Sequence, residues 1–319
     1  MSAPRLAVVY IGDQKCHQLS LYSLASIARS HAAPLDLHFL QSNYDAEIPE
    51  ALTGFVAACG HRLIAARADF ELPEVGSRDA ATTWAYITDT MFLKAAAIES
   101  LASSYDYILY VDSDILAFAD LNLAELAGFE EVAAACIDLT VADTIDWPAS
   151  LDRSNSQTIE VGAVFNSGLV MVNAKRWRAE GVYKRYLDCL REHQSGCPYH
   201  RNCEPNDQCA FNMALAGEWR QLMPGLNLQK VAMHTNAWAV ATVRHYSGSS
   251  KFWPMRMHRC DRREYALLCS ISKETGLPHP GSFYDGGLSY WLNGIRRARD
   301  VSRAERTLAH AYMLFALLA

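Results

Sequence analysis

The chain has 319 residues, 50% of them hydrophobic, and carries a formal net charge of −6 from 29 basic and 35 acidic side chains. This length and a mean hydropathy of −0.05 are typical of a globular protein with one large core or two small ones, so an extended disordered chain is excluded. Because nucleic-acid-binding proteins normally carry a basic surplus, the acidic balance predicts no nucleic-acid partner.

The cysteines and the apolar runs indicate in which cellular compartment the protein is expected. Nine cysteines is an odd number, and most lie inside apolar runs, which favours reduced, buried thiols. The apolar run at residues 6–11 is too short for the hydrophobic region of a signal peptide, and no uninterrupted apolar stretch reaches membrane-spanning length. We therefore expect a cytoplasmic protein.

Four side chains of metal-binding type lie close together in the sequence, at Cys197, His200, Cys203 and Cys209. Zinc is the metal that such a set would hold, but the spacing matches no familiar structural zinc pattern. Cys209 also falls inside an apolar, helix-like run. These observations argue against a zinc site.

The first part of the chain alternates strands and helices. Predicted strands lie at residues 6–11, 35–40, 62–65 and 107–111, and predicted helices at residues 21–28, 49–59 and 88–103. Crossover connections between successive strands of this kind are right-handed and generate parallel sheets. The predicted fold class is therefore α/β, with a Rossmann-like, mostly parallel central sheet flanked by helices.

The second part continues the sheet and then becomes less regular. Apolar runs predict strands at residues 132–137 and 165–173, the latter entered through a turn at Gly168. Residues 174–196 follow as one predicted helix. Residues 244–254 are too rich in Gly, Ser and Pro to predict regular structure.

Two carboxylates, Asp112 and Asp114, follow directly after the strand predicted at residues 107–111. The carboxyl ends of strands in an open α/β sheet border the ligand crevice, where two acids can share a divalent cation with phosphate oxygens. The alternative is that acids at a strand end form a turn and cap the next helix. A lone Asp-x-Asp does not separate these interpretations.

Five motifs in chain order resemble those of the retaining glycosyltransferases of family 8. They stand at residues 110–116 (YVDSDIL), 135–139 (ACIDL), 165–169 (FNSGL), 206–208 (NDQ) and 245–251 (HYSGSSK). The resemblance extends over most of residues 6–254. It implies an A-type glycosyltransferase fold and the transfer of a hexose, with galactose or glucose favoured, from a UDP-sugar to a saccharide or glycolipid acceptor.

The resemblance also assigns roles to single residues. It makes Asp112, Asp114 and His245 the metal ligands, and mixed oxygen and imidazole ligands suit manganese better than magnesium, which is the alternative. It implies donor-binding roles for Tyr10, Asp13, Lys94, Asp138, Asn166, Gly248 and Lys251, and catalytic roles for Asp207 and Gln208.

Two places depart from the family pattern. Lys15 and Cys16 stand where Asn or Tyr is usual after the first strand, and Phe252 replaces the proline that is common after the loop lysine. Loss of a proline should alter the stiffness of the loop more than it alters metal binding.

The mechanism implied by the resemblance is retention at the anomeric carbon. The metal and Lys251 would stabilise the charge that develops on the departing UDP. Gln208 is the only residue that the family offers below the sugar ring, and an amide is a poor nucleophile. A same-face mechanism is therefore favoured, and double displacement stays open.

The resemblance ends near residue 254, so we expect a nucleotide-sugar-binding catalytic domain at residues 1–254 and a basic, largely helical extension at residues 255–319. The extension carries Arg296, Arg297, Arg299, Arg303 and Arg306. A basic, aromatic tail suits peripheral docking on the anionic inner face of a membrane that carries a lipid-linked acceptor. A helix packed back on the catalytic domain is the equal alternative.

Three other functions are alternatives to sugar transfer. A haloacid-dehalogenase-type phosphatase also carries Asp-x-Asp after an apolar strand, but the motif here lies deep in the chain and lacks the residues usual after it. Nucleotidyl transfer would need a Gly-rich basic loop near the N-terminus, where Gly12 stands alone. A non-catalytic module that binds a sugar nucleotide is the main alternative, and only turnover would exclude it.

Overall fold

The computed structural model describes residues 4–71, 89–139, 164–193, 207–248, 251–253, 261–283 and 294–318. Its central sheet contains β1 (Leu6–Gly12), β2 (Asp36–Ser42), β3 (Arg62–Ala68), β4 (Tyr107–Val111), β6 (Ala133–Ile137), β7 (Phe165–Asn173) and β8 (Trp219–Gln221). The strands lie in the order β3-β2-β1-β4-β7-β6-β8. Each strand predicted from the sequence is present, because long apolar runs rich in Val, Ile and Leu are suited to a sheet covered on both faces.

Most neighbouring strands are parallel. β1 pairs in parallel with β2 and β4, β2 with β3, and β6 with β8, whereas β7 runs antiparallel to β4 and β6. The predicted mostly parallel sheet is therefore confirmed. The prediction of a turn at Gly168 is wrong, since this residue lies inside β7, where its carbonyl oxygen accepts a 2.7 Å hydrogen bond from the Asp112 amide.

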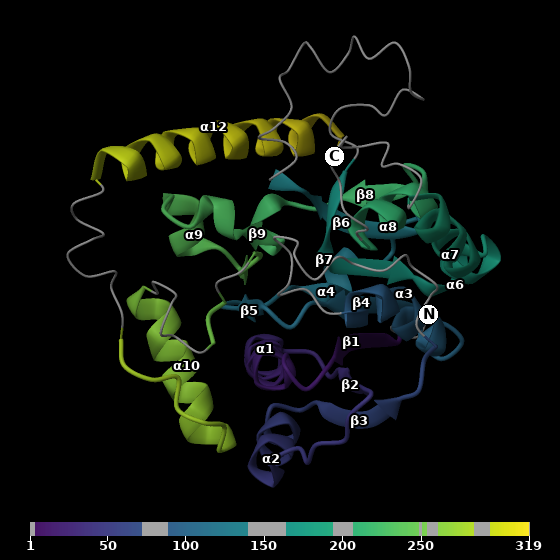
Figure 1. Cartoon of the computed structure of the whole chain (residues 1–319), viewed down its shortest axis with the longest axis horizontal. Helices are drawn as coiled ribbons and strands as arrows, with labels where there is room; N and C mark the ends of the chain where they lie inside the picture. The colour runs from purple at the N-terminus through teal and green to yellow at the C-terminus, as the bar shows by residue number, and fades with distance from the viewer. Residues whose placement is uncertain are drawn as a thin grey trace.

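Helices cover both faces of the sheet (Figure 1). One face is covered by α1 (His17–Ser30) and α2 (Glu50–Ala58), and the other by α3 (Lys94–Leu101), α6 (Ala174–Ala179), α7 (Val182–His193) and α8 (Asp207–Leu215). Successive residues of a strand point to opposite faces, so Val8 and Tyr10 enter the first core and Val9 and Ile11 the second. The central sheet thus separates two hydrophobic cores.

Two predicted helices differ in detail. The helix predicted at residues 88–103 begins as a 3-10 helix, η1 (Asp89–Leu93), before α3. The helix predicted at residues 174–196 is divided into α6 and α7 at Gly181, whose φ of 60° is left-handed and ends α6.

A second, three-stranded sheet lies beside the central one. It contains β5 (Ile115–Ala117), β10 (Val243–His245) and β9 (Leu228–Gln229), in the order β5-β10-β9. The prediction of irregular structure from residue 244 is wrong for β10, which pairs His245 with Ile115 across an antiparallel ladder. Short elements surround this sheet: α4 (Leu123–Leu126), η3 (Pro224–Leu226), η4 (Lys230–Ala232) and α9 (Asn236–Val240).

The C-terminal part of the chain is helical where it is described. The helix α10 (Arg262–Thr275) packs against α1 and α2 (Figure 1). The helix α12 (Gly294–Leu318) contacts η3 and η4. Leu268 of α10 and Leu308 of α12 belong to the same buried core as α1. None of the helices in the described part of the chain combines the length and hydrophobicity needed to cross a membrane.

Candidate functional site

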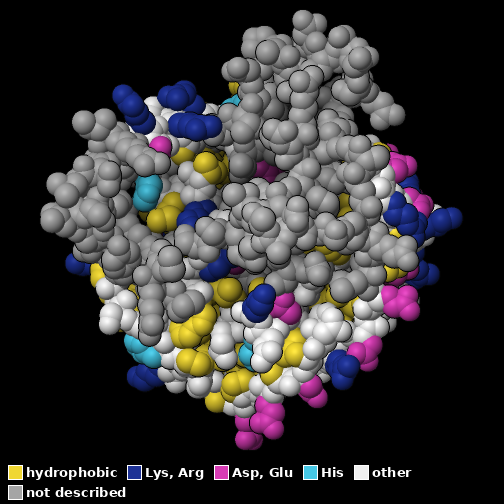
Figure 2. Space-filling view, viewed as in Figure 1, with side chains coloured by type: hydrophobic (Ala, Val, Ile, Leu, Met, Phe, Trp, Pro, Cys, Tyr) yellow, Lys and Arg dark blue, Asp and Glu magenta, His cyan; other side chains and the backbone are white. Residues whose placement is uncertain are grey.

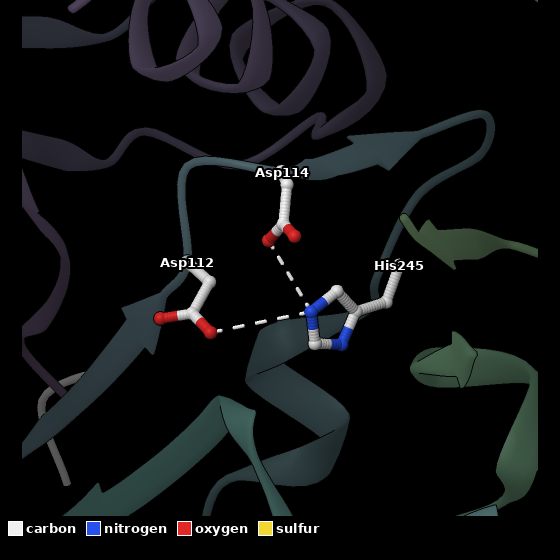
Figure 3. A group of neighbouring side chains, drawn as sticks. All are labelled: Asp112, Asp114 and His245. Atoms are coloured by element: carbon white, nitrogen blue, oxygen red, sulfur yellow. Dashed lines mark ion pairs between the residues drawn. The ribbon is translucent and has the colours of Figure 1, made fainter. Parts of the chain in front are cut away.

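Three predicted metal ligands meet at the junction of the two sheets (Figure 3). Asp112 follows β4, Asp114 precedes β5, and His245 ends β10. His245 Nε2 lies 3.2 Å from Asp114 Oδ1 and 4.0 Å from Asp112 Oδ2, and one ligand atom from each residue lies within 4.8 Å of the others. Two carboxylates and an imidazole at these separations can bind one divalent cation.

A chain of amide hydrogen bonds orients His245. The Asp138 carboxylate can only accept, so Asn166 must direct Nδ2 toward it, at 3.0 Å. Asn166 Oδ1 then faces Asn227 Nδ2, which donates to it at 3.0 Å, and Asn227 Oδ1 faces His245 Nδ1 at 3.1 Å. His245 therefore carries its proton on Nδ1, and Nε2 presents its lone pair to the carboxylates.

Asn227 is a functional residue that the sequence did not reveal. It is completely buried and comes from the short segment between η3 and β9. No periodicity or motif marks that segment, and only the position of its amide between Asn166 and His245 shows its role. An Asn next to a short, Gly- and Pro-containing turn is otherwise read as a turn former.

Gln208 belongs to the same polar network. Its Nε2 donates to Asp138 Oδ2 at 2.9 Å, and its Oε1 accepts from Asn166 Nδ2 at 3.2 Å and from the Ser167 amide at 3.1 Å. Both ends of the amide are therefore engaged, which fixes the side chain in one orientation. The structure thus brings together three of the predicted site residues, Asp138, Asn166 and Gln208.

Lys94 is a buried charge between Asp112, a predicted metal ligand, and Asp207, a predicted catalytic residue. Its Nζ lies 2.6 Å from Asp207 Oδ2, 3.6 Å from Asp112 Oδ1 and 3.0 Å from Ser167 Oγ. Burial would lower the pKa of Lys94, but the carboxylates of Asp112 and Asp207 outweigh it and raise the pKa. The lysine therefore stays protonated and holds two predicted site carboxylates in place.

Replacing Lys94 with Met should lower the free energy of unfolding by about 3 to 5 kcal/mol, because removing one partner leaves the buried Asp207 carboxylate without its counter-charge. Urea denaturation measures this difference. The control is Lys184→Met, at an exposed position of α7, which should change stability by no more than about 0.5 kcal/mol. Equal effects of the two substitutions would contradict the role given to Lys94.

Lys251 contacts the metal group, by which we mean Asp112, Asp114 and His245. Its Nζ donates to Asp114 Oδ2 and, at 3.3 Å, to the carbonyl oxygen of Tyr246. Burial alone would raise the pKa of Asp114, but the positive charge of Lys251 outweighs it and holds the pKa well below its usual range. Asp114 is therefore ionised and ready to bind a cation.

Gly248 lies between His245 and Lys251. Its φ of 91° is in the left-handed region, which favours glycine. Residues 249–250 of this predicted loop lie outside the described residues. Phe252, which replaces the common proline, is fully buried against Tyr246 and Tyr22.

The two remaining predicted residues belong to the first strand and its turn. The Tyr10 side chain is buried in the core and its hydroxyl accepts from Ser23 Oγ at 3.2 Å, so its ring does not face the metal group. Asp13 accepts a 3.0 Å hydrogen bond from the Cys16 amide. Burial and the charge of Asp13 raise the pKa of the Cys16 thiol to about 11, although a hydrogen bond with Ser113 opposes this rise. Because Ser113 stands between Asp112 and Asp114, the turn lies beside the metal-binding residues.

Three of the four side chains of metal-binding type, Cys197, His200 and Cys203, lie outside the described residues. The fourth, Cys209, is buried inside α8 among apolar side chains. The residue expected to precede that helix, Asn206, also lies outside the described part.

Comparison with known proteins points to glycosyltransferases. The family model for Glycosyl transferase family 8 matches residues 7–256. The chain is 29% identical over 139 residues to Glycosyltransferase GlyD of Streptococcus pneumoniae serotype 4, a match that covers 41% of this chain and 14% of GlyD. It is 22% identical over 245 residues to Lipopolysaccharide 1,3-galactosyltransferase of Salmonella typhimurium, covering 72% of this chain and 68% of that protein. The chain thus spans only a small part of GlyD.

The fold has known counterparts. The solved structure of galactosyltransferase LgtC in complex with donor and acceptor sugar analogs superposes with a TM-score of 0.58 at 19% identity, covering 85% of this chain and 95% of LgtC. At that identity the likeness shows a shared fold, which is the A-type glycosyltransferase fold expected above. Because the family model covers more than three quarters of the sequence, the chain belongs to glycosyltransferase family 8.

Proposed function

We propose that this protein transfers a hexose, galactose or glucose, from a UDP-sugar to a hydroxyl of a saccharide or glycolipid, with retention at the anomeric carbon. The observation that carries the proposal is the meeting of Asp112, Asp114 and His245 beside the ammonium of Lys251. Such a site offers metal ligands and a positive charge together, which is what a departing diphosphate requires. The similarity to Lipopolysaccharide 1,3-galactosyltransferase supports galactose as the transferred sugar.

The donor set fits manganese, with magnesium as the alternative. His245 Nε2 offers an imidazole lone pair, and Asp112 and Asp114 offer hard oxygen atoms. When bound, the metal supplies positive charge that stabilises the diphosphate as it leaves. Lys251 forms an ion pair with Asp114. Its ammonium therefore lies beside a proposed metal ligand, where it could also interact with a phosphate oxygen of the donor.

The sugar would lie over the network of Asp138, Asn166 and Gln208, with the Lys94–Asp207 pair behind it. The fixed amide of Gln208 can hold the ring or polarise its hydroxyls, but an amide is a poor nucleophile. The Asp207 carboxylate is engaged by Lys94 at 2.6 Å, which opposes its use as a nucleophile as well. We therefore favour the same-face mechanism, in which a UDP oxygen accepts the proton of the acceptor hydroxyl.

A panel of UDP-sugars assayed with Mn²⁺ tests the proposal. UDP release is measured with and without saccharide acceptors, and again after chelation with EDTA. Transfer from UDP-galactose or UDP-glucose that stops on chelation supports the proposal. Full activity in EDTA would contradict the metal site, and UDP binding without turnover of any donor would favour a non-catalytic sugar-nucleotide module.

Gln208→Ala should lower kcat about 100-fold while the Kd for UDP changes less than about twofold, because the amide faces the sugar and not the diphosphate. Steady-state rates and calorimetric titration with UDP measure the two quantities. The control is Gln221→Ala, which removes another buried glutamine, one that donates to the Ala311 carbonyl at 3.3 Å. It should affect stability but leave kcat near wild type. Equal losses of kcat and UDP affinity in Gln208→Ala would overturn the assignment.

The acceptor side includes a proposed peripheral contact with a membrane. Arg299, Arg303 and Arg306 are exposed on α12, and basic side chains gather over this helix in Figure 2. Leu308 and Ala311 of α12 are buried against the core, whereas Tyr312 and Met313 are exposed. We propose that this exposed face of α12 contacts the lipid surface. Sedimentation with anionic vesicles at low salt, compared with neutral vesicles, tests this contact.

A further inference from the structure

The strand that carries His245 has a buried positive charge on its other face. Arg244 precedes His245 in β10, and adjacent strand residues point to opposite sides, so Arg244 lies behind the metal group. Its side chain is completely buried. Its Nε donates to the Trp238 carbonyl at 2.8 Å, and its guanidinium lies 4.3 Å from the centre of the Phe118 ring.

Two acids of the C-terminal segment neutralise this charge. Arg244 Nη1 lies 2.7 Å from Asp261 Oδ2 and 3.9 Å from Glu264 Oε2, and the Glu264 side chain is only 1% exposed. Asp261 also caps α10, since its Oδ1 accepts from the Glu264 amide at 2.8 Å. Both acids lie beyond residue 256, where the family match ends.

Removing a carboxylate that pairs with a buried guanidinium is strongly destabilising, because it leaves a buried charge without its counter-charge. β10 has three residues, and it pairs on one side with the first residues after Asp114. The next amide along the chain, that of Tyr246, donates to the Asp114 carbonyl at 2.9 Å. A shift of Arg244 would therefore move His245 and the backbone contact of Asp114 together.

We propose that Asp261 and Glu264 are positioning residues, which hold Arg244 and thereby fix His245 and Asp114 in their metal-binding geometry. The inference rests on the proposed function, because it assumes that this group binds a divalent cation. In this arrangement the N-terminus of α10 supports the metal ligands through Arg244 and supplies no ligand itself.

The test uses the full chain with Asp261→Asn and Glu264→Gln. Asn is as good an N-cap as Asp, so the first variant keeps the cap of α10 and removes only the charge that faces Arg244. Binding of Mn²⁺ in the presence of UDP is measured from the electron paramagnetic resonance of free Mn²⁺. We expect each variant to bind Mn²⁺ about tenfold more weakly, as is common when a partner behind a ligand is lost.

Kinetics and a matched control separate positioning from general stability. The Mn²⁺ concentration for half-maximal rate should rise with the dissociation constant, while kcat at saturating Mn²⁺ stays near wild type. The control is Glu274→Gln on the same helix, which breaks the surface ion pair with Arg29 (3.0 Å) and should leave Mn²⁺ affinity unchanged.

Wild-type Mn²⁺ affinity in both variants, whatever their melting temperatures, overturns the positioning role. If Glu264→Gln does not fold, Asp261→Asn decides alone, since its side chain is 40% exposed. If the wild-type protein binds Mn²⁺ and transfers sugar, and both variants have the same Mn²⁺ affinity as the wild type, only this inference is overturned. A wild type that binds no Mn²⁺ overturns the proposed function as well.

Discussion

Asp114→Asn should lower kcat/KM for sugar transfer about a thousandfold, equivalent to roughly 4 kcal/mol of transition-state stabilisation. The change keeps the size of the side chain but removes a charged metal ligand that is almost completely buried. It also deprives Lys251 of its partner and leaves His245 Nε2 with one carboxylate in place of two. The amide cannot replace the carboxylate as a ligand of comparable charge.

Steady-state rates at saturating UDP-sugar, together with calorimetric titration of Mn²⁺, measure this loss. Asp106→Asn is the matched control, because Asp106 lies just before β4, at the opposite end of the strand from the metal group. Asp106 is exposed and accepts a 2.8 Å hydrogen bond from the Arg5 amide, so its replacement should change the rate less than about twofold. Retention of more than a tenth of wild-type activity in Asp114→Asn would refute the metal assignment.

Gly168→Ala should weaken Mn²⁺ binding about 100-fold without unfolding the protein. A Cβ at this position would lie 2.3 Å from His245 Cε1, 2.9 Å from His245 Nδ1 and 3.0 Å from Asp112 Oδ2. The Gly168 carbonyl accepts a hydrogen bond from the Asp112 amide, and the next residue, Leu169, pairs with Val111 of β4, so the backbone cannot retreat. The imidazole must therefore turn away from both Asn227 and the carboxylates.

The control for this substitution is Gly54→Ala in α2, where an added Cβ meets nothing within 4 Å. That change should leave Mn²⁺ affinity unaltered and should stabilise the helix by about 0.5 to 1 kcal/mol, since alanine restricts the unfolded chain. Equal Mn²⁺ affinity in Gly168→Ala and in Gly54→Ala would show that the space beside His245 is not required.

The sequence predicted the parts of the site that depend on local order along the chain. Asp112 and Asp114 follow an apolar strand, and the end of a parallel strand must reach the edge of the sheet, so their position could be expected without coordinates. The partner residue His245 came from the resemblance to the family. Its strand was missed, because three residues in a Gly- and Ser-rich segment give no periodicity.

The unpredicted features depend on contacts between distant segments. Asn227 and Arg244 are buried polar residues, and their sequence neighbourhoods look like turns and loops. Their roles follow from pairing with Asn166 in one case and Asp261 in the other. Gly168 illustrates the same limit: glycine in a strand favours a bulge or a close approach, but only the structure shows that the approaching group is His245.

The pairing of β10 with β5 has a consequence for folding kinetics. Lys251 and Asp114 are 137 residues apart in the chain, so their contact closes a long loop. The entropy of closing such a loop must be overcome before its contacts contribute, and contacts of high sequence separation slow folding. A growing chain cannot assemble the metal site until β10 has been synthesised and has docked. Recovery of Mn²⁺ affinity during refolding should therefore lag behind recovery of helical circular dichroism, and the delay would report the closure of this loop.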